Sequence, residues 1–337
     1  MQEKARTASE VHRPSVSFVV PIYNAEKTLD QCLGSISAQT LEDIEVVCVN
    51  DGSTDESKSI IEDFCARDAR FHLLDKSNSG YGDSMNHCMK RATGEYVGIV
   101  ESDDWLAENM AELLYSAAQR HDEPDIVKGC YWRVCNPDAE SQTIVPAFYY
   151  QHISTTDVRF TIDEDADLLM YHPSIWSALY RRSFLENTHI AFMAEPGAAW
   201  VDNPFMMEAA TAARSIVYID EPVYYYREFN QGSSSLVKDP RIIFDRWLDM
   251  DNILKRKGIT APKVLEAHYS RGCWSIQELL TGFPQDPLAK KGIREIVERI
   301  DYDAVYRSTK ILQAYKDAYQ SQVKLSTRLA HKLKRAR

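Results

Sequence analysis

Acidic residues gather in two short segments of the chain, and each segment follows a run of apolar residues. One segment is Asn50-Asp51-Gly52-Ser53-Thr54-Asp55, and the other is Glu101-Ser102-Asp103-Asp104. Carboxylate oxygens suit hard divalent cations, and a bound cation offsets the repulsion that such a cluster would exert on a phosphate group. The two segments therefore suggest a site for a phosphate-bearing ligand together with a metal ion.

Each acidic segment also has a simpler explanation. Asp51 and Gly52 could form only a tight turn into the next helix, for which Asp55 is a plausible N-cap. Either Asp103 or Asp104 could cap a following helix, which we expect to begin near Trp105. One helix needs only one N-cap, and Glu101 should lie on the same strand face as Asp103. The surplus of acids favours a functional site.

Other common chemical motifs are missing from the sequence. No GxGxxG or GxxxxGK[ST] segment follows a predicted strand, and Gly80-Tyr81-Gly82 lacks the third glycine of a dinucleotide-binding loop. The odd number of cysteines and the lack of a CxxC pair predict reduced, buried thiols rather than a disulfide framework or a zinc site. These cysteines are Cys32, Cys48, Cys65, Cys88, Cys130, Cys135 and Cys273.

The segments that must position the acids alternate between short apolar runs and amphipathic helices from residue 16 to about 131. Four apolar runs predict buried strands of a mostly parallel sheet, at 15–22, 44–50, 71–75 and 95–102. In a doubly wound sheet the ligand binds beyond the carboxyl ends of the strands, which is where both acidic segments fall. The chain is thus expected to have an α/β fold.

The second half of the chain is less regular. Short strands at 142–150, 215–219 and 222–227 are mixed with helices expected near 163–171 and 203–213. From Pro240 onward the pattern is almost wholly helical, and the serine-rich stretch after Gly232 marks the junction. We therefore expect a helical C-terminal region after the α/β body.

Charge and composition exclude several classes of protein. The 337 residues include 44% hydrophobic and 26% charged residues, which is ordinary globular usage. A formal net charge of −11 argues against general binding to nucleic acid through its phosphates. No apolar stretch approaches the ~20 residues needed to cross a bilayer, and the first residues lack the apolar core of a signal peptide. We expect a cytoplasmic protein.

Residues 323–337 differ in charge from the rest of the chain. They contain six lysines and arginines and no acidic residue, and Leu325, Leu329 and Leu333 recur every fourth position. This pattern suits a basic amphipathic helix lying on an anionic membrane surface. A solvated terminus is the alternative.

Five motifs, taken in order, resemble those of family 2 glycosyltransferases with the GT-A fold. They are Val19-Val20-Pro21-Ile22-Tyr23-Asn24, Asn50-Asp51-Gly52-Ser53-Thr54-Asp55, Asn78-Ser79-Gly80 with Asn86, Gly94-Glu95-Tyr96, and Glu101-Ser102-Asp103-Asp104. The resemblance is strong over about residues 15–135 and looser to about 235. It implies a nucleotide-diphosphate sugar donor, with a UDP-sugar expected, and a glycan or lipid-linked glycan acceptor.

The resemblance also assigns roles to individual residues. Asp51 is expected to meet the uracil or ribose, and Asp103 with Glu101 to bind Mn²⁺ or Mg²⁺. The remaining nucleotide-binding positions that it implies are Pro21, Tyr23, Glu26, Asn78, Gly80, Asn86, Ser102 and Arg227.

Two positions depart from the commoner family pattern. Glu101 stands where aspartate is usual, and Met85 stands where an arginine often precedes Asn86. Lys76 is expected to supply positive charge nearby.

The acceptor side of the site is expected in Pro196-Gly197-Ala198-Ala199-Trp200-Val201-Asp202-Asn203-Pro204-Phe205. Asn203 followed by Pro204 predicts an N-cap and the first helical residue, which leaves Asp202 projecting. By resemblance Asp202 is the catalytic base, with a surface acid or an alternative cap as the other interpretation and Glu208 as the next candidate base.

Trp176 and Arg227 each allow a functional and a structural interpretation. Trp176 matches a family segment but suits a core position equally well. Arg227 with Ser233-Ser234-Ser235 resembles a segment that closes over the diphosphate, although Arg227 could form an ordinary ion pair at a strand end.

These expectations give a domain plan and a function. The plan is a flexible N-terminus at 1–14, a catalytic domain at 15–235, a helical region at 236–322 and a basic tail at 323–337. Within the catalytic domain, 15–135 forms the nucleotide-binding half and 136–235 the acceptor-binding half. The function is that of an inverting glycosyltransferase of bacterial capsule, exopolysaccharide or lipopolysaccharide synthesis, placed peripherally at the inner face of the membrane.

Two other functions stay open. A sugar nucleotidyltransferase would need a glycine-rich loop with Lys or Arg after the first strand, and PIYNAEKT at 21–28 has none. A non-catalytic nucleotide- or glycan-binding module would fit if Glu101 marked a lost metal site.

Overall fold

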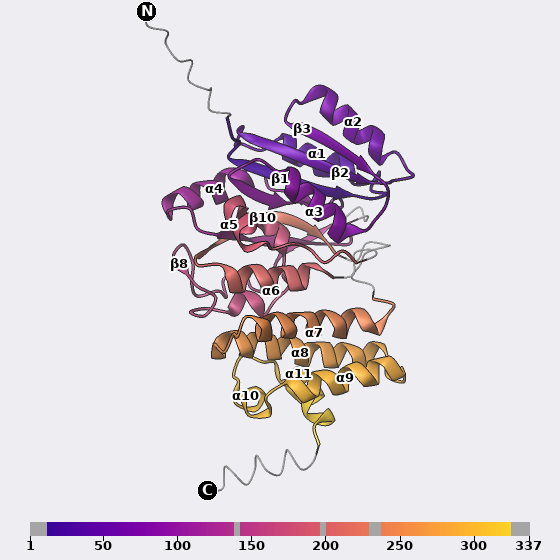
Figure 1. Ribbon diagram of the computed structural model, residues 1–337, viewed down its shortest axis with the longest axis vertical. Helices are drawn as coiled ribbons and strands as arrows, with labels where there is room; N and C mark the ends of the chain where they lie inside the picture. Colours follow the sequence, from indigo (N-terminus) through magenta and orange to yellow (C-terminus); the bar gives the residue numbers. More distant parts are fainter. Residues whose placement is uncertain (1–11, 138–141, 196–199, 229–236, 325–337) are drawn as a thin grey trace, which may run out of the picture.

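A single mixed sheet organises the α/β body. The computed structural model describes residues 12–137, 142–195, 200–228 and 237–324. Its main sheet runs in the order β3-β2-β1-β4-β9-β6-β10-β5, with helices packed around it (Figure 1). Every residue of β1 and β2 is buried. Because alternate residues of a strand point to opposite faces, both faces of this part of the sheet must be covered.

The first half of the sheet is parallel and repeats a strand-helix unit. Its strands are β1 (Val16–Ile22), β2 (Ile44–Asp51), β3 (Phe71–Lys76) and β4 (Tyr96–Ile99). The helices between them are α1 (Leu29–Ser37), α2 (Ser57–Arg67) and α3 (Tyr81–Arg91). The predicted parallel strands are therefore confirmed, and the carboxyl ends of β2, β1 and β4 lie side by side.

The second half of the sheet mixes directions. β9 (Ala178–Arg181) runs antiparallel to β4 and to β6 (Ile126–Cys135). β10 (Ile216–Arg227) runs parallel to β6, and β5 (Trp105–Leu106) pairs antiparallel with β10. The remaining elements of the body are α4 (Met110–Arg120), β7 (Thr143–Pro146), β8 (Arg159–Phe160), η1 (Asp167–Leu169), η2 (Ile175–Ser177), α5 (Arg182–Thr188) and α6 (Asp202–Ala212).

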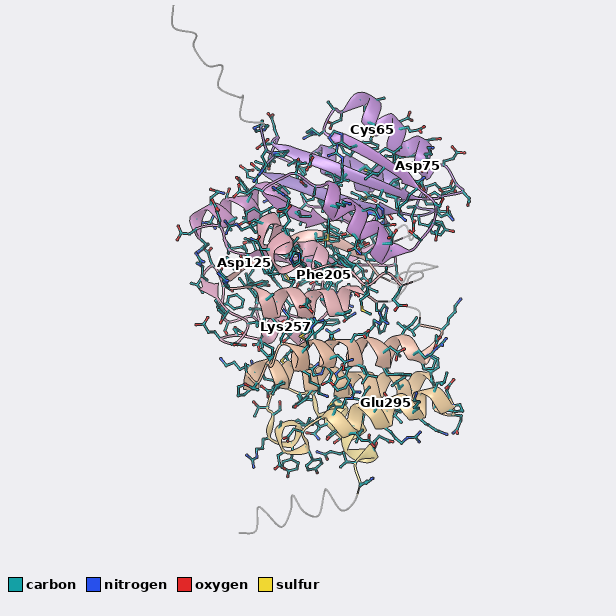
Figure 2. The ribbon with its side chains drawn as sticks, in the orientation of Figure 1. Cys65, Asp75, Asp125, Phe205, Lys257 and Glu295 are labelled. Atoms are coloured by element: carbon teal, nitrogen blue, oxygen red, sulfur yellow. The ribbon has the colours of Figure 1, made fainter. Side chains whose placement is uncertain are left out.

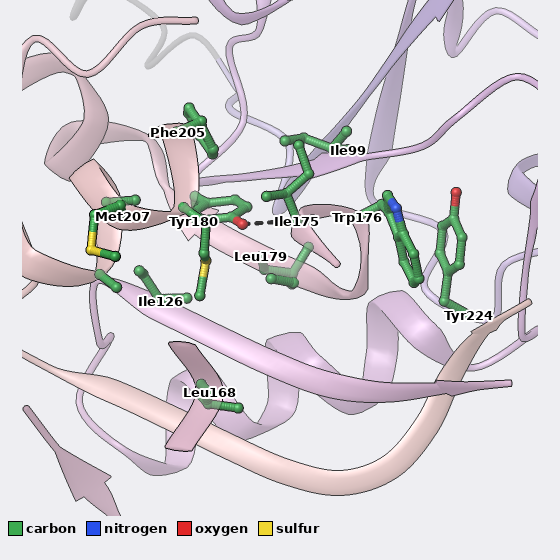
Figure 3. Close-up of a cluster of buried hydrophobic side chains, with 14 of the residues drawn as sticks. Ile99, Ile126, Leu168, Ile175, Trp176, Leu179, Tyr180, Phe205, Met207 and Tyr224 are labelled. Carbon is green, nitrogen blue, oxygen red and sulfur yellow. Dashed lines mark hydrogen bonds between the residues drawn. The ribbon is translucent and has the colours of Figure 1, made fainter. Parts of the chain in front are cut away.

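Aromatic side chains fill the core where η2 meets β10. The ring of Trp176 stacks on Tyr224 with centroids 4.2 Å apart (Figure 3). It also stacks on Tyr226, with centroids 5.2 Å apart. Beside it, the hydroxyl of Tyr180 donates to the carbonyl of Ile175 at 3.0 Å (Figure 3). Trp176 is only 3% exposed. Of the two interpretations of Trp176 that the sequence allowed, the structure therefore supports a core residue.

In residues 237–324, which the structure describes, five helices form the predicted C-terminal region. They are α7 (Pro240–Arg256), α8 (Pro262–Gly282), α9 (Pro287–Arg299), α10 (Tyr302–Arg307) and α11 (Gln313–Gln322). The first three each begin with a proline, which costs nothing at a position whose N–H has no helical partner. α7 packs along α6, and Lys257 lies at this boundary (Figures 1 and 2). The helical region therefore packs on the sheet body through α6.

Several predicted boundaries were wrong. The helix expected near Trp105 begins at Met110, because Trp105 and Leu106 pair with β10. The acids before them form a turn beyond β4, so neither Asp103 nor Asp104 caps a helix, and Glu101 does not extend the strand. The strands expected at 215–219 and 222–227 are one irregular strand, β10. The helix expected near 163–171 is only the 3-10 turn η1.

The structure also bears on the cysteines and on membrane insertion. All seven cysteines are unpaired, and five of them are buried, as predicted. Among the helices that the structure describes, none is long and apolar enough to cross a membrane. Most of the predicted N-terminal segment 1–14, Ser233-Ser234-Ser235 and tail residues 325–337 lie outside the described residues.

Candidate functional site

The loops after β1 and β2 are joined to each other by their side chains. The amide N–H of Thr54 donates to the side chain of Asn24 at 2.8 Å, and that of Glu56 donates to the Glu26 carboxylate at 3.1 Å. Tyr23 stands beside them with 53% of its surface exposed. Glu26 thus supports the shape of this surface, and Tyr23 is the side chain available to a ligand.

Asp51 ends β2 and is almost completely enclosed. Its carboxylate accepts the backbone N–H groups of Ser79 and Gly80 at 2.9 and 3.0 Å, and the ammonium of Lys76 at 2.5 Å. Lys76 also pairs with Asp83 at 3.1 Å. Burial opposes the charged form of Lys76, but its bonds to Asp51 and Asp83 outweigh burial and raise its pKa. The positive charge predicted here is present and is tied to Asp51.

Near Asp51, the backbone at Gly52 approaches the backbone of the loop after β3 closely. Gly52 has φ of +70°, and a Cβ at this position would lie 2.8 Å from the backbone nitrogen of Asn78. Gly80 also has a positive φ, of +95°. Only glycine adopts both conformations without strain. These two glycines bring the exposed side chain of Asn78 next to the end of β2.

The turn beyond β4 carries the densest group of acids. Glu101 accepts the hydroxyl of Tyr81 at 2.6 Å. Burial raises the pKa of Glu101 to about 8. The nearby charges of Asp103 and Asp202 also raise this pKa, and the bond from Tyr81 lowers it. Glu101 is therefore largely protonated at neutral pH in the absence of a cation.

Asp104 has a structural role in this turn. Its carboxylate accepts the backbone N–H of Arg227 at 2.7 Å and the hydroxyl of Tyr224 at 3.0 Å. The same hydroxyl accepts the N–H of Glu101 at 3.0 Å, so Tyr224 ties β10 to the acidic turn. Burial raises the pKa of Asp104. The sequence contained no signal for Tyr224 beyond its place in a strand.

Arg227 lies at the end of β10 beside this turn. Its guanidinium donates to the side chain of Gln31 and lies over the ring of Trp105, 4.8 Å from the centroid. Within the part of the chain that the structure describes, its Nε has no hydrogen-bond partner. Arg227 is thus a buried cation next to the acids, at the edge of the surface where a diphosphate is expected.

The acidic turn fits a divalent cation in its chemistry. Within the described residues no group of three or more His, Cys, Asp or Glu side chains is arranged to hold a metal. Mg²⁺, however, is usually bound by one or two carboxylates together with substrate phosphates. Asp103 is half-buried between Glu101 and Asp104, and mutual repulsion contributes to the raised pKa of both neighbours. A cation would relieve this repulsion.

The position of Asp202 corrects one prediction. Helix α6 begins at Asp202, so Asn203 is not the N-cap and Pro204 is the third helical residue. A proline fits there because the first N–H groups of a helix have no helical acceptor. The Asn203 amide donates to Oδ1 of Asp202 at 3.0 Å. Burial raises the pKa of Asp202, although the positive charge of Arg271 opposes this shift.

The fold brings Asp202 close to the acidic turn beyond β4. Its charge contributes to the raised pKa of Tyr81 and of Glu101, so the three groups share one electrostatic environment. Glu208 does not share it, because its carboxylate pairs with Lys257 at 2.9 Å and with Arg256 at the end of α7. Of the two candidate bases, Asp202 is the one near the strand ends.

Other predicted positions turn out to support the backbone. The Asn86 side chain donates to the carbonyl of Phe192 at 2.9 Å and accepts its N–H at 2.8 Å. Ser102 accepts the hydroxyl of Thr28 through its carbonyl at 2.9 Å, and Pro21 is buried at the end of β1. Met85 is fully buried. These residues shape the site, and no local pattern in the sequence indicates that Asn86 would bind Phe192.

Two neighbouring cavities lie between α6, α7 and α8. Asn203, Met250 and Arg271 line both of them. Trp200 and Trp274 line the second cavity, with ring centroids 6.0 Å apart. Asn203, the residue after Asp202, therefore connects both cavities with the beginning of α6.

Comparisons of the sequence identify relatives. Residues 17–188 match Glycosyl transferase family 2. Glycosyltransferase EpsJ of Bacillus subtilis is 34% identical over 216 residues, covering 64% of this chain and 61% of that protein. Glycosyltransferase GlyG of Streptococcus pneumoniae is 31% identical over 226 residues, covering 63% of this chain and 70% of that protein. This chain spans 61% of the length of both EpsJ and EpsH, the first two curated relatives.

Comparisons of the structure extend over almost the whole chain. Residues 1–349 of S. aureus TarS in complex with UDP match with a TM-score of 0.70 and 21% identity, covering 94% of this chain and 92% of that one. The mannosyltransferase PcManGT from Pyrobaculum calidifontis, in complex with GDP-Man and Mn²⁺, matches with a TM-score of 0.52 and 18% identity, covering 92% and 87%. The fold predicted from the sequence, including its helical C-terminal region, is confirmed.

Proposed function

This chain belongs to glycosyl transferase family 2, and we propose that it transfers a sugar from a nucleotide-diphosphate donor to an acceptor hydroxyl, with inversion at the anomeric carbon. The observation that carries this proposal is the convergence of acids from separate elements. Asp51 ends β2, Glu101 and Asp103 follow β4, and Asp202 begins α6 in the electrostatic range of Glu101.

The nucleotide would lie across the loops after β1, β2 and β4. Tyr23 and Asn78 are exposed there, and Asp51 holds the loop that carries Asn78 through two backbone bonds. A UDP-sugar is the proposed donor. Support comes from two matching structures of TarS, which are complexes with UDP and with UDP-GlcNAc, while PcManGT with GDP-Man supports a nucleotide sugar more generally.

We infer that Asp103 would hold a divalent cation, Mn²⁺ or Mg²⁺. Glu101 can join it as a ligand by giving up its bond from Tyr81. When bound, the cation would supply positive charge to the leaving diphosphate. The hard oxygen donors of the turn support this assignment, as does the Mn²⁺ in the PcManGT complex.

Asp202 is the proposed general base. Its carboxylate would accept the proton of the acceptor hydroxyl while the hydroxyl oxygen bonds to the anomeric carbon and the diphosphate leaves. A base works best when its pKa lies near the working pH, and burial moves the pKa of Asp202 in that direction. Arg227 would stabilise negative charge on the leaving side.

We propose that the acceptor is a glycan or lipid-linked glycan of the bacterial cell surface. The basic tail 323–337 would bring the enzyme to an anionic membrane. Deleting 323–337 should reduce binding to phosphatidylglycerol vesicles at low salt without changing UDP affinity. Unchanged vesicle binding would mean that the tail does not contact the membrane.

Nucleotide release tests the proposed activity. Candidate UDP-sugars are incubated with the protein and Mn²⁺, with and without bacterial glycan acceptors, and free UDP is measured after a donor panel has been screened by calorimetry. Acceptor-stimulated UDP release is the expected result. Formation of UTP and a sugar 1-phosphate when pyrophosphate is added to the UDP-sugar would instead indicate a nucleotidyltransferase, and tight UDP binding without release would indicate a non-catalytic module.

A further inference from the structure

A line of hydrogen bonds runs from the helical region to Asp202. Arg271, in the middle of α8, donates to the side-chain oxygen of Asn203 and to the backbone carbonyl of Tyr171. Asn203, in the first turn of α6, donates its amide to Asp202 at 3.0 Å. Two residues thus connect a helix far along the sequence with the first residue of α6.

The chemistry of the two side chains fixes the direction of this line. A guanidinium has only donors, so the side chain of Asn203 must turn its oxygen toward Arg271. Its NH₂ group is then left to face Asp202, whose ionised carboxylate only accepts. Asn203 is 8% exposed, so water has little access to compete for either bond. Arg271 therefore determines which group Asn203 presents to Asp202.

Packing alone does not explain an arginine at this position. Burial lowers the pKa of Arg271 to about 10. Among the described residues its Nε has no hydrogen-bond partner, and its side chain lines both cavities between α6, α7 and α8. A buried guanidinium without a direct ion pair costs stability that an apolar side chain of similar length would not. A functional reason for the charge is therefore to be expected.

We propose that Arg271 is a positioning residue for the transfer reaction, acting through Asn203 to orient the Asp202 carboxylate toward the acceptor hydroxyl. The proposal rests on the proposed function, in which Asp202 is the base. It makes helix α8 part of the catalytic unit, although this helix lies outside the region matched by the family.

The charges around Asp202 predict the direction in which its pKa should change when Arg271 is replaced. Glu101, Tyr81 and Tyr180 face it from the turn after β4, from α3 and from β9, and Arg271 faces it from α8. Of these, Arg271 is the group that favours the ionised carboxylate. A nearby positive charge stabilises the ionised form of a carboxyl group. Removing it should raise the pKa of Asp202.

Arg271→Met and Asn203→Ala test the proposal, with Arg246→Met as the matched control. Arg246 lines the second cavity from α7 and pairs with Asp249 at 3.3 Å, so its loss removes a neighbouring buried charge outside the line of bonds. We expect Arg271→Met to lower kcat about 10- to 100-fold and to move the acid limb of its pH profile upward by about one to two units. Arg271→Lys should restore the position of that limb, and UDP affinity should not change.

A second measurement does not depend on turnover. The titration of the Asp202 carboxyl carbon is followed by NMR in wild type, Arg271→Met and Arg246→Met, with Asp202→Asn identifying the signal. An upward shift only in Arg271→Met supports the proposal, and an unchanged titration with unaltered thermal stability overturns it. Loss of the proposed function would appear differently, as a wild-type protein that titrates as expected but neither binds UDP nor transfers sugar.

Discussion

Asp202 is the residue on which the proposed chemistry depends most. Replacing it with asparagine keeps the shape and removes the basic oxygen, so transfer should fall at least ~10²-fold. Donor affinity should barely change, because a base that acts in the transition state contributes little to ground-state binding. Turnover and UDP affinity are measured together, and Glu208→Gln is the control because Glu208 pairs with Lys257 instead. A parallel loss of UDP affinity would make Asp202 a donor-site acid.

Asp103 is the corresponding residue on the nucleotide side. Asp103→Ala should remove the dependence of UDP affinity on Mn²⁺ while leaving the melting temperature nearly unchanged, because the side chain is half-buried in a turn outside the core. Calorimetric titrations with Mn²⁺ and with EDTA measure the difference. Asp83→Ala serves as the control, since Asp83 pairs with Lys76 outside the acidic turn. UDP affinity that still responds to Mn²⁺ in Asp103→Ala would rule out Asp103 as the ligand.

At the residue scale, the sequence could predict which acidic residues lie at the site better than it could predict their hydrogen-bond partners. Acids at the ends of predicted strands identified Asp51, Glu101 and Asp103, because parallel strands present their carboxyl ends at one edge. The bonds from Tyr81 to Glu101 and from Tyr224 to Asp104 join residues 20 and 120 positions apart. No local pattern encodes such pairs.

The segment that carries η2 is held by a buried lysine, and this gives a prediction at the scale of an element. Lys128 in β6 donates to the carbonyl and hydroxyl of Ser174 at 2.6 and 2.7 Å and to the hydroxyl of Ser177 at 2.9 Å. Ser174 has φ of +36°, an uncommon conformation for serine. Burial lowers the pKa of Lys128 to about 7.

This lowered pKa makes stability depend on pH. Between pH 7 and about 10.5 the unfolded chain holds a proton on Lys128 that the folded chain has lost, so this group adds stability as the pH rises. The added stability is lost as the pH falls through about 7. Lys128→Met should therefore reduce the slope of unfolding free energy against pH by up to about 1.4 kcal/mol per unit in this range.

Urea unfolding of wild type and variant at several pH values measures that slope. Lys58→Met is the control, because Lys58 forms an exposed pair with Asp75. Equal slopes in wild type and Lys128→Met would mean that the lysine stays charged in the folded protein.

A strand or helix could be predicted where a single hydrophobicity pattern determined its type. Continuous apolar runs identified β1 and β2, since strands covered on both faces leave no polar alternation. β5 has only two residues and exists through its pairing with β10, so tertiary contact and not propensity forms it. The same holds for the first turn of α6, where Asp202 and Asn203 are helical before the proline that was expected to begin the helix.

At the scale of the whole molecule, the sheet body and the helical region share several polar contacts. Besides the line from Arg271 to Asn203, Lys257 pairs with Glu208 at 2.9 Å, and Lys310 pairs with Asp167. α7 packs along α6, and the apolar core runs without interruption through both regions. We therefore expect the two regions to unfold as one cooperative unit, although the sequence pattern changes sharply at Pro240.

Ligand binding tests this cooperativity at a distance. A ligand that binds only the folded protein stabilises it by about 2.7 kcal/mol at 100 times its dissociation constant. If unfolding is cooperative throughout, UDP with Mn²⁺ should slow the exchange of the slowest amides in α8 as much as that of the slowest amides in β1. Hydrogen exchange with mass spectrometry, with and without saturating UDP, makes the comparison. Slower exchange confined to the sheet body would show that the helical region unfolds separately, and the positioning of Asp202 by Arg271 would then be interrupted whenever α8 opens.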